Sequence, residues 1–264
     1  ALFYEPSSRT FGSFVSAMQR LGGGFIPLNG MDNTSVVKGE SLEDTVRTFS
    51  AYADVLVMRH PEVGSLDVAA KYATKPVINA GDGAYGEHPT QALIDLYTIK
   101  QIFGKIEGLH ILIIGDLAHY RPTNSLVKLL ANYPNVSLLL ATPKEVPITE
   151  NVRSYLRHRR VSFREHTSFE DFLPDADVLY VTRVKKEYMS DELYQKIQGS
   201  YVITKSLTKQ MKKRSIIMHC LPRAGEIHAD VDVDSRAVYF RDQLENGLYL
   251  RMALLALILK KDGI

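Results

Sequence analysis

Short apolar runs of strand length recur along the chain and alternate with stretches that have helical spacing. In the second half these runs cover residues 111–114, 136–141, 178–182 and 216–219. Uninterrupted apolar strands are typical of parallel sheets whose two faces are both covered. The sequence therefore predicts an α/β protein built on doubly wound parallel sheets.

The first half shows the same alternation, with expected strands at 2–4, 54–59 and 76–80 and expected helices at 42–53, 66–73 and 89–103. His88 and Pro89 open the last of these helices, because proline is favourable in a first helical turn. Residues 247–259 are apolar nearly all round, which predicts a helix buried between layers.

The length of 264 residues is sufficient for two domains, each with its own core. We expect a first domain at 1–103, a second at 104–242, and a C-terminal helix within 243–264 that packs back on the first. Ligands of such sheets bind at the carboxyl ends of the strands. A cleft between the two domains is therefore the expected site.

Composition excludes several kinds of partner. A net charge of +2 gives no bulk electrostatic case for nucleic acid, and no apolar run approaches the roughly 20 residues of a membrane helix. The single cysteine, Cys220, excludes an intramolecular disulfide and fits a reducing compartment, so a cytoplasmic location is expected. The chain opens without methionine inside an expected strand, which suggests that a front segment, with any targeting peptide, is missing.

Residues 5–11 (EPSSRTF) have the pattern of a phosphate-binding helix start. Pro6 ends the preceding strand, and Ser7 or Ser8 can cap a helix that Gly22 to Gly24 end. The free N–H groups of a helix start attract an anion, and Arg9 stands among them. The alternative is an ordinary capped helix with a surface arginine.

Polar residues follow the expected strands repeatedly. Arginines occupy four such places, Arg9, Arg59, Arg121 and Arg183. Guanidinium groups bind phosphate and carboxylate bidentately, so the pattern predicts substrates with several negative charges. His88, just before a helix, is better placed to polarise a carbonyl than to bind a metal, since no second histidine or cysteine stands at ligand spacing. The chain has no Walker motif, which disfavours ATP.

Nine segments in the right order resemble the aspartate carbamoyltransferase (aspartate transcarbamylase) family, most closely the form fused into the animal multifunctional pyrimidine-synthesis protein. The resemblance covers essentially the whole chain. It rests on FYEPSSRT (3–10), VVKGESLEDTVR (36–47), VMRHP (57–61), PVINAGDG (76–83), GEHPTQALID (86–95), IIGDL (113–117), LYVTRVKKE (179–187), IIMHCLPR (216–223) and YFRDQLENGLYLRMALL (239–255).

That resemblance implies transfer of the carbamoyl group of carbamoyl phosphate to L-aspartate, which is the second step of de novo pyrimidine synthesis. It implies a phosphate site at Ser7, Ser8, Arg9 and Thr10, and an oxyanion site made by Arg59, His88 and Thr10. It also implies that Gln91 binds the carbamoyl amine, and that aspartate is bound by Arg121, Arg183, the residue at position 185 and the backbone of Leu221.

The family resemblance further implies a homotrimer with shared sites. Lys38, with Thr34 near it, belongs to a mobile loop that in this family reaches into the neighbouring subunit's site. Lys38 is thus expected to act in catalysis alongside Arg59, His88 and Thr10. The resemblance implies catalysis by positioning and electrostatics without a cofactor, and a possible place in a larger multifunctional or regulatory assembly.

Four departures from the family pattern bear on activity. Lys185 stands where the family has a glutamine that contacts aspartate, and Cys220 stands in a His-Cys-Leu-Pro form that is usual in ornithine carbamoyltransferases. Tyr120 and Pro122 flank Arg121 in place of glycine and threonine, and one extra residue precedes His88. The alternative interpretations are a lysine that points to water at position 185 and a small buried apolar residue at position 220.

Three functional hypotheses follow from these residues. An active aspartate carbamoyltransferase is favoured over a carbamoyltransferase with a different amine acceptor and over a non-catalytic homologue. Lys38 and Arg183 suit a dicarboxylate and repel a cationic acceptor such as ornithine.

Overall fold

The computed structural model describes residues 1–32, 34–83 and 86–260. The chain forms two compact units, Ala1–Thr90 with Glu245–Ile264, and Gln91–Leu244. The chain passes between the units within helix α4 (Pro89–Phe103) and again within helix α9 (Asp242–Ile258). The predicted division at 103/104 and the predicted interdomain cleft stay predictions.

The first unit has a four-stranded sheet in the order β2-β1-β3-β4, with every neighbouring pair parallel. Its strands are β1 (Leu2–Phe3), β2 (Leu28–Asn29), β3 (Leu56–His60) and β4 (Val77–Asp82). Its other elements are α1 (Ser8–Arg20), the 3₁₀ turn η1 (Ser35–Lys38), α2 (Leu42–Tyr52) and α3 (Ser65–Tyr72).

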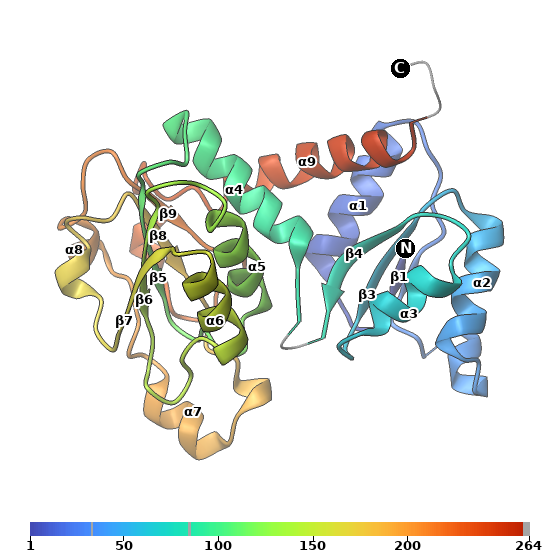
Figure 1. Cartoon of the computed structure of the whole chain (residues 1–264), viewed down its shortest axis with the longest axis horizontal. Helices are drawn as coiled ribbons and strands as arrows, with labels where there is room; N and C mark the ends of the chain where they lie inside the picture. Colours follow the sequence, from blue (N-terminus) through green and yellow to red (C-terminus); the bar gives the residue numbers. More distant parts are fainter. Residues whose placement is uncertain (33, 84–85, 261–264) are drawn as a thin grey trace. The chain divides into compact units, whose positions relative to one another are not determined.

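Helices lie on both sides of this sheet (Figure 1), and alternate residues of β3 pack into two separate clusters. Leu56 and Met58 pack in a cluster with residues of α2 and α3, whereas Val57 packs in a cluster with residues of α1 and α9. The period of two follows from the alternation of side chains along a strand. Helices therefore cover both faces, as the apolar runs predict.

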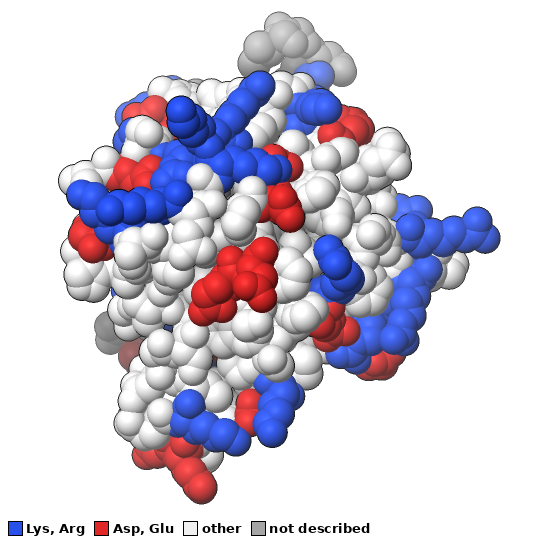
Figure 2. All heavy atoms as spheres, turned by 90° about the vertical axis from the view of Figure 1, so that its left-hand side faces the viewer, with Lys and Arg blue, Asp and Glu red and all other residues white. Residues whose placement is uncertain are grey.

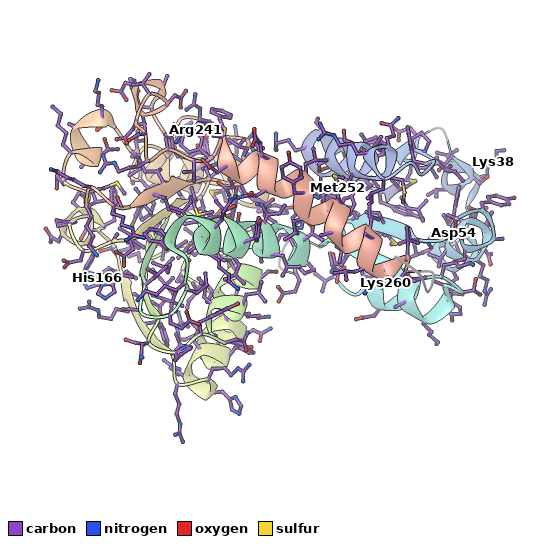
Figure 3. The ribbon with its side chains drawn as sticks, turned by 90° about the horizontal axis from the view of Figure 1, so that it is seen from above. Lys38, Asp54, His166, Arg241, Met252 and Lys260 are labelled. Atoms are coloured by element: carbon purple, nitrogen blue, oxygen red, sulfur yellow. The ribbon has the colours of Figure 1, made fainter. Side chains whose placement is uncertain are left out.

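Helix α9 packs back on the first unit, but the expectation that it is buried all round is wrong. Leu255 is buried beside Phe14, and the guanidinium of Arg251 lies 5.0 Å from the Phe14 ring centroid. On other sides of the helix Tyr249 and Leu257 are 54% and 62% exposed. An apolar sequence therefore did not determine how many sides of this helix are covered. Figure 3 shows its course, with Met252 labelled midway.

The second unit has a five-stranded parallel sheet in the order β7-β6-β5-β8-β9. Its strands are β5 (His110–Ile114), β6 (Ser137–Ala141), β7 (Ser162–His166), β8 (Val178–Val181) and β9 (Ile216–Met218). Its remaining helices and turns are α5 (Arg121–Leu130), α6 (Glu150–His158), η2 (Glu170–Phe172), η3 (Lys186–Tyr188), α7 (Asp191–Ile197), α8 (Lys205–Thr208) and η4 (Ala229–Val231).

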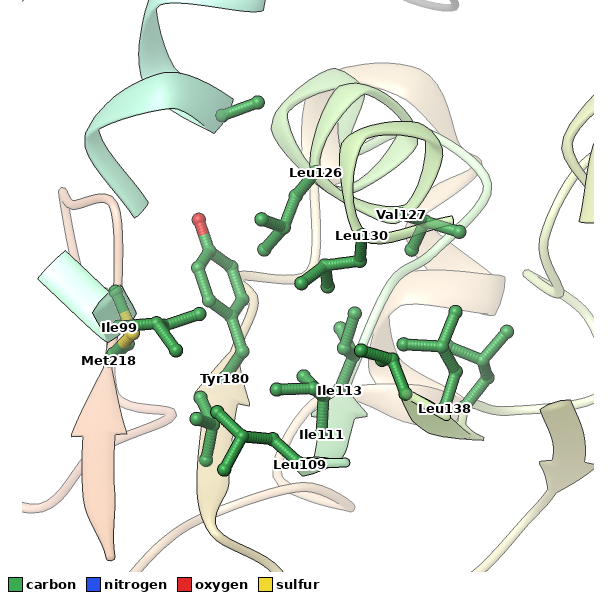
Figure 4. Packing of buried hydrophobic residues seen from close by; sticks show 14 of the residues in the cluster. Ile99, Leu109, Ile111, Ile113, Leu126, Val127, Leu130, Leu138, Tyr180 and Met218 are labelled. Atoms are coloured by element: carbon green, nitrogen blue, oxygen red, sulfur yellow. The ribbon is translucent and has the colours of Figure 1, made fainter. Parts of the chain in front are cut away.

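The central strand β5 divides the core of this unit in two. Ile111 and Ile113 lie in one cluster with Leu126 and Leu130 of α5 (Figure 4). Leu112 and Ile114, which alternate with these residues along the strand, lie in the cluster on the other face. Both faces of β5 are thus covered, which explains its uninterrupted apolar sequence.

Charges of both signs are mixed on the surface of the second unit. On the face drawn in Figure 2, Lys and Arg gather in separate groups with Asp and Glu between them. In the described part of the chain, no helix is long and apolar enough to cross a membrane.

Candidate functional site

Helix α1 begins as the sequence predicts, with Ser7 as its N-cap and Ser8 as its first residue. The Ser7 backbone is extended, yet its side chain makes no capping hydrogen bond. The first-turn N–H groups of a helix have no acceptor within the helix. The cap side chain supplies no acceptor here, the side chains of Ser8 and Arg9 in this turn are exposed, and Thr10 is buried.

Arg59 lies next to this helix start, at the end of β3. Its Nε donates to Glu5 Oε1 at 2.6 Å, and its carbonyl accepts from the N–H of Tyr4 at 2.9 Å. Strands β1 and β3 are parallel neighbours with Phe3 opposite Arg59, so both end at the same edge of the sheet. Glu5, for which the sequence analysis predicts no role, therefore orients the guanidinium of Arg59.

His88 is buried directly before Pro89, the first residue of α4. Its Nδ1 lies 3.5 Å from Thr90 Oγ1. Residues 84 and 85, which include the region of the extra residue, lie outside the described part of the chain. Among the described residues, no group of three or more His, Cys, Asp or Glu side chains is arranged to hold a metal ion.

Lys38 ends the 3₁₀ turn η1, in the segment expected to be a mobile loop. Thr34 caps this turn by accepting from the N–H of Val36 at 3.3 Å, and Glu40 accepts from the Thr45 hydroxyl of α2 at 2.7 Å. Lys38 is exposed at the periphery of the first unit (Figure 3) and forms no ion pair with another described residue. Asn33, part of the same predicted segment, lies outside the described residues.

Gln91, in the first turns of α4, is tied to a carboxylate one helical turn further on. Its Nε2 donates to Asp95 Oδ1 at 2.8 Å. Asp95 is completely buried and also accepts from the Tyr180 hydroxyl at 2.8 Å and from Gln243 Nε2 at 2.7 Å.

Arg121 is the first residue of α5 and only 3% exposed. Pro122 follows it in the first turn, where a missing N–H costs nothing. Tyr120 is the N-cap residue, and its hydroxyl lies 2.9 Å from Cys220 Sγ. Burial first, and the neighbouring Cys220 second, raise the pKa of Tyr120 well above its ordinary value. Two of the departures from the family pattern are therefore in direct contact.

Arg183 follows β8 and is held by Glu187. The two side chains form a bidentate ion pair, with Nη2 to Oε1 at 2.5 Å and Nη1 to Oε2 at 3.3 Å. Burial acts to lower the pKa of Arg183, but the Glu187 carboxylate outweighs it and the pKa is raised. Nε of Arg183 is buried and has no hydrogen-bond partner among the described residues. The side chain borders a cavity of about 230 Å³ that Glu226 also lines.

The alternative that Lys185 points to water is wrong, because the residue is only 8% exposed. Its Nζ lies 4.8 Å from the ring centroid of Tyr188 and 5.8 Å from that of Tyr120. Burial, followed by the positive charge of Arg121, lowers the pKa of Lys185 to about 8. The alternative for Cys220 is confirmed only in part, since this residue is partly buried against apolar neighbours but also contacts Tyr120.

Leu221 has a left-handed backbone conformation, with φ of 57°, and precedes a cis proline, Pro222. Its N–H donates to His219 Nδ1 at 2.7 Å. The other ring nitrogen of His219 therefore carries the proton, which it donates to Glu226 Oε1 at 2.6 Å. Burial acts to raise the pKa of Glu226, but the hydrogen bond and charge of His219, together with backbone N–H donors, outweigh it and lower that pKa.

The sheet orders bring the predicted residues together within each unit. In the first, residues 5–10 come after β1, Arg59 lies near the end of the neighbouring strand β3, and His88 comes after β4. In the second, Arg121 comes after β5, while Arg183 and Lys185 come after β8 and Leu221 after β9, again neighbouring strands. The sequence did not identify the residues that hold these groups in place, namely Glu5, Asp95, Asp116, Tyr188, Glu187, His219, Glu226 and Gln243.

Two family models match the chain. The carbamoyl-P binding domain of aspartate/ornithine carbamoyltransferase matches residues 1–101, and the Asp/Orn binding domain matches residues 107–258.

Curated relatives include fused and separate proteins. The chain is 48% identical over 258 residues to the multifunctional protein pyr1-3 of Dictyostelium discoideum and 48% identical over 262 residues to the multifunctional protein CAD of Squalus acanthias. These matches cover 97% and 99% of the chain but only 11% and 12% of those proteins. The chain is 49% identical to the aspartate carbamoyltransferase catalytic subunit of Thermococcus gammatolerans, over 98% of the chain and 83% of that protein.

Among solved structures, the aspartate transcarbamoylase of Trypanosoma cruzi in complex with carbamoyl phosphate matches with a TM-score of 0.93 at 39% identity, covering 98% of this chain and 82% of that one. The same enzyme has been solved with N-(phosphonacetyl)-L-aspartic acid. The catalytic subunit of M. jannaschii aspartate transcarbamoylase matches with a TM-score of 0.89 at 44% identity, covering 100% and 85%. With both of its units matched by the two family models and with relatives close to half identical, the chain belongs to the aspartate/ornithine carbamoyltransferase family.

Proposed function

We propose that the chain converts carbamoyl phosphate and L-aspartate into N-carbamoyl-L-aspartate and phosphate, the second step of de novo pyrimidine synthesis. The observation that carries this proposal is the cationic acceptor site of the second unit, where Arg121, Arg183 and Lys185 follow the neighbouring strands β5 and β8. Three cations suit an acceptor with two carboxylates and repel a cationic amine such as ornithine.

Carbamoyl phosphate is the proposed ligand of the first unit. The open first turn of α1, with Ser7, Ser8, Arg9 and Thr10, supplies N–H groups, hydroxyls and a guanidinium for the phosphate. Arg59, oriented by Glu5, and His88 are placed with Thr10 around the carbamoyl oxygen. Gln91, which directly follows Thr90 of that unit in the chain, binds the carbamoyl amine.

Aspartate is the proposed ligand of the second unit. Arg121 and Arg183 take its carboxylates, and the buried Nε of Arg183 is available for one of these contacts. Lys185 replaces the family glutamine by a cation, which strengthens the field that attracts a dicarboxylate. The backbone of Leu221 orients the amine.

In the reaction the carbamoyl group is transferred from a phosphate oxygen to the amine nitrogen of aspartate. The neutral amine of aspartate forms a C–N bond with the carbamoyl carbon, and negative charge develops on the carbamoyl oxygen. Arg59, His88 and Thr10 stabilise that charge, as the donors of an oxyanion hole do. The C–O bond to phosphate then breaks, phosphate leaves with the bonding electrons, and the amine nitrogen loses one proton. Each step uses positioning and electrostatics, so no cofactor is required.

A homotrimer with shared sites is the proposed assembly. The exposure of Lys38 and of its neighbour Val37, which is 63% exposed, supports a role for this turn in another copy of the chain. Two relatives are named multifunctional proteins, which supports a possible place in a larger assembly. The cytoplasm is the proposed compartment, supported by the single cysteine, although plant relatives are named chloroplastic.

The test is product formation with a panel of acceptors. The purified chain is incubated with carbamoyl phosphate and with aspartate, glutamate, ornithine or putrescine, and carbamoylated products are identified by mass spectrometry. Phosphate release is measured in parallel. We expect N-carbamoyl-L-aspartate as the main product. Preferential carbamoylation of ornithine would establish the second candidate, which the ornithine-type Cys220 favours, and no product with any amine would indicate a non-catalytic homologue.

A further inference from the structure

A continuous chain of buried hydrogen bonds runs through the second unit from Gln91 to Leu221. Asp95 Oδ1 accepts from the carboxamides of both Gln91 and Gln243, at 2.8 and 2.7 Å. Gln243 Oε1 in turn accepts from the backbone N–H of His219 at 3.1 Å. His219 Nδ1 then accepts from the N–H of Leu221 at 2.7 Å.

All the intermediate members of this chain are buried. Asp95 is 0% exposed, His219 1% and Gln243 3%. Hydrogen bonds shielded from water are costly to leave unmade, so each partner holds the next in one orientation. Gln91 and Leu221, at the two ends, are the only members that are partly exposed.

Asp95 determines which atom of Gln91 can face a ligand. A carboxylate oxygen accepts hydrogen bonds, so the group of Gln91 that contacts it must be the NH₂. The carboxamide oxygen of Gln91 then remains as its acceptor. An acceptor is what the NH₂ of a carbamoyl group requires, whereas a flipped carboxamide would present a second donor and repel it.

The other end of the chain fixes a backbone. Leu221 has φ of 57°, a region that costs free energy for a residue with a branched side chain. The hydrogen bond from its N–H to His219 holds this conformation and thereby sets the direction of its carbonyl. The backbone of Leu221 is the group proposed to orient the attacking amine.

We propose that Asp95 is a positioning residue for both substrates, since it orients Gln91 directly and Leu221 through Gln243 and His219. This inference rests on the proposed roles of Gln91 and Leu221. In this account the carbamoyl ligand contacts one end of the hydrogen-bond network, at Gln91, and the amine ligand contacts the other end, at Leu221. Tyr180, which donates to the other oxygen of Asp95, belongs to the network without leading to either ligand.

Four variants separate positioning from stability. Asp95→Ala removes both branches, whereas Asp95→Asn keeps an oxygen that can accept from both glutamines and an NH₂ that can donate to Tyr180. Gln243→Leu cuts only the branch to Leu221. Tyr180→Phe is the matched control, because it removes a buried hydrogen bond to the same carboxylate but leaves both branches intact. Dissociation constants for carbamoyl phosphate and for N-(phosphonacetyl)-L-aspartate are measured by calorimetry, KM values by assay, and melting temperatures by circular dichroism.

We expect Asp95→Ala to weaken carbamoyl phosphate binding about tenfold and to raise the KM for aspartate, whereas Asp95→Asn restores both to within about threefold. Gln243→Leu raises the KM for aspartate alone, and Tyr180→Phe lowers only the melting temperature. In a double-mutant cycle, Asp95→Ala should weaken carbamoyl phosphate binding no further once Gln91 is alanine.

The inference is overturned if Asp95→Ala lowers the melting temperature but leaves both substrate parameters within twofold of the parent. It is also overturned if the effects of Asp95→Ala and Gln91→Ala on carbamoyl phosphate binding add. If the unsubstituted protein carbamoylates another amine in preference to aspartate, the proposed function is wrong. The same variants, measured with that amine, then test the role of Asp95. If the parent binds neither carbamoyl phosphate nor N-(phosphonacetyl)-L-aspartate, both proposals are wrong.

Discussion

Lys185 is the residue at which the acceptor site departs most in charge from its family. An ammonium replaces a neutral carboxamide, and it lies between the rings of Tyr120 and Tyr188 close to two arginines. Burial and the charge of Arg121 bring its pKa down to about 8. The charge of this site therefore changes as the pH rises through about 8.

The first prediction is a pH-dependent affinity for dicarboxylates. Because the pKa of Lys185 is lowered, the side chain is charged below pH 8 and becomes neutral as pH rises through about 8. Succinate, which has two carboxylates and no amine, should bind about tenfold more weakly at pH 9.5 than at pH 7. The dissociation constant is measured by calorimetry at constant ionic strength.

Lys185→Gln is the matched variant, since it restores the family residue. Its succinate affinity should change less than threefold over the same pH range and should depend less on salt, while aspartate carbamoylation is preserved or improved. An unchanged pH profile in this variant, or loss of its activity with aspartate, would contradict the assigned role of Lys185.

Positioning residues are the part of the site that the sequence did not reveal. The arginines, His88 and the serines could be predicted because each belongs to a short motif next to an apolar strand. Asp95 carries a weaker signal, an acidic residue four positions after Gln91 on a helix that also carries many apolar residues. Gln243 and Glu226 have no local sequence signal. Their partners, Asp95 and His219, lie 148 and 7 residues away in the chain and are brought into contact only by the fold.

At the scale of elements, Asp116 joins the loop after β5 to the turn η3 after β8. Its carboxylate is completely buried and accepts from the N–H and Nδ1 of His119, each at 3.0 Å, and from the N–H of Lys185 at 3.2 Å. Gly115 permits the close approach of these loops, because its φ is 109° and a Cβ would lie 2.4 Å from Thr182 Oγ1. Asp116 thus links the segments that carry Arg121 and Lys185, alongside the Thr182 hydroxyl, which donates to the carbonyls of Ile114 and Asp116.

The second prediction is that Asp116→Ala destabilises the protein by about 2–4 kcal/mol, because several buried donors lose their acceptor. Urea denaturation followed by far-UV circular dichroism measures the change. The matched control is Asp191→Ala, which removes an acidic residue of the same type from an exposed pair with Lys186. That control should change stability by no more than about 0.5 kcal/mol. Equal effects of the two substitutions would contradict the bridging role of Asp116.

Elements with an apolar pattern were predictable and those without one were not. The strands of both sheets that pack on two faces appear at or near their predicted positions. Strand β7 (SFREH) was missed because it lies at the sheet edge and is mostly exposed, so four of its five residues are polar. For helix α9 the apolar sequence correctly predicted a helix but overestimated its burial, because Tyr249 and Leu257 are exposed.

At the scale of the whole molecule, the proposed trimer makes a prediction about mixed subunits. If Lys38 acts in the neighbouring copy's site and His88 in its own, Lys38→Ala chains and His88→Ala chains are each inactive alone. After equal mixing and exchange, roughly a quarter of the sites should carry neither lesion and regain activity.

The control is a mock exchange of Lys38→Ala chains with themselves, which should recover nothing. Native mass spectrometry verifies that mixed trimers have formed. Activity that stays at the level of the separate variants after verified exchange would show that each site is built from one chain.

The central claim is that two sets of residues, one in each unit, act on a single pair of substrates. Calorimetric titration with N-(phosphonacetyl)-L-aspartate tests this most directly, because this molecule joins a phosphonate to an aspartate. The account predicts one molecule bound per chain, at least a hundredfold more tightly than phosphate or succinate alone, and weaker binding for both Arg9→Ala and Arg121→Ala. Binding no tighter than that of phosphate alone, or binding that is insensitive to one of the two substitutions, would contradict it.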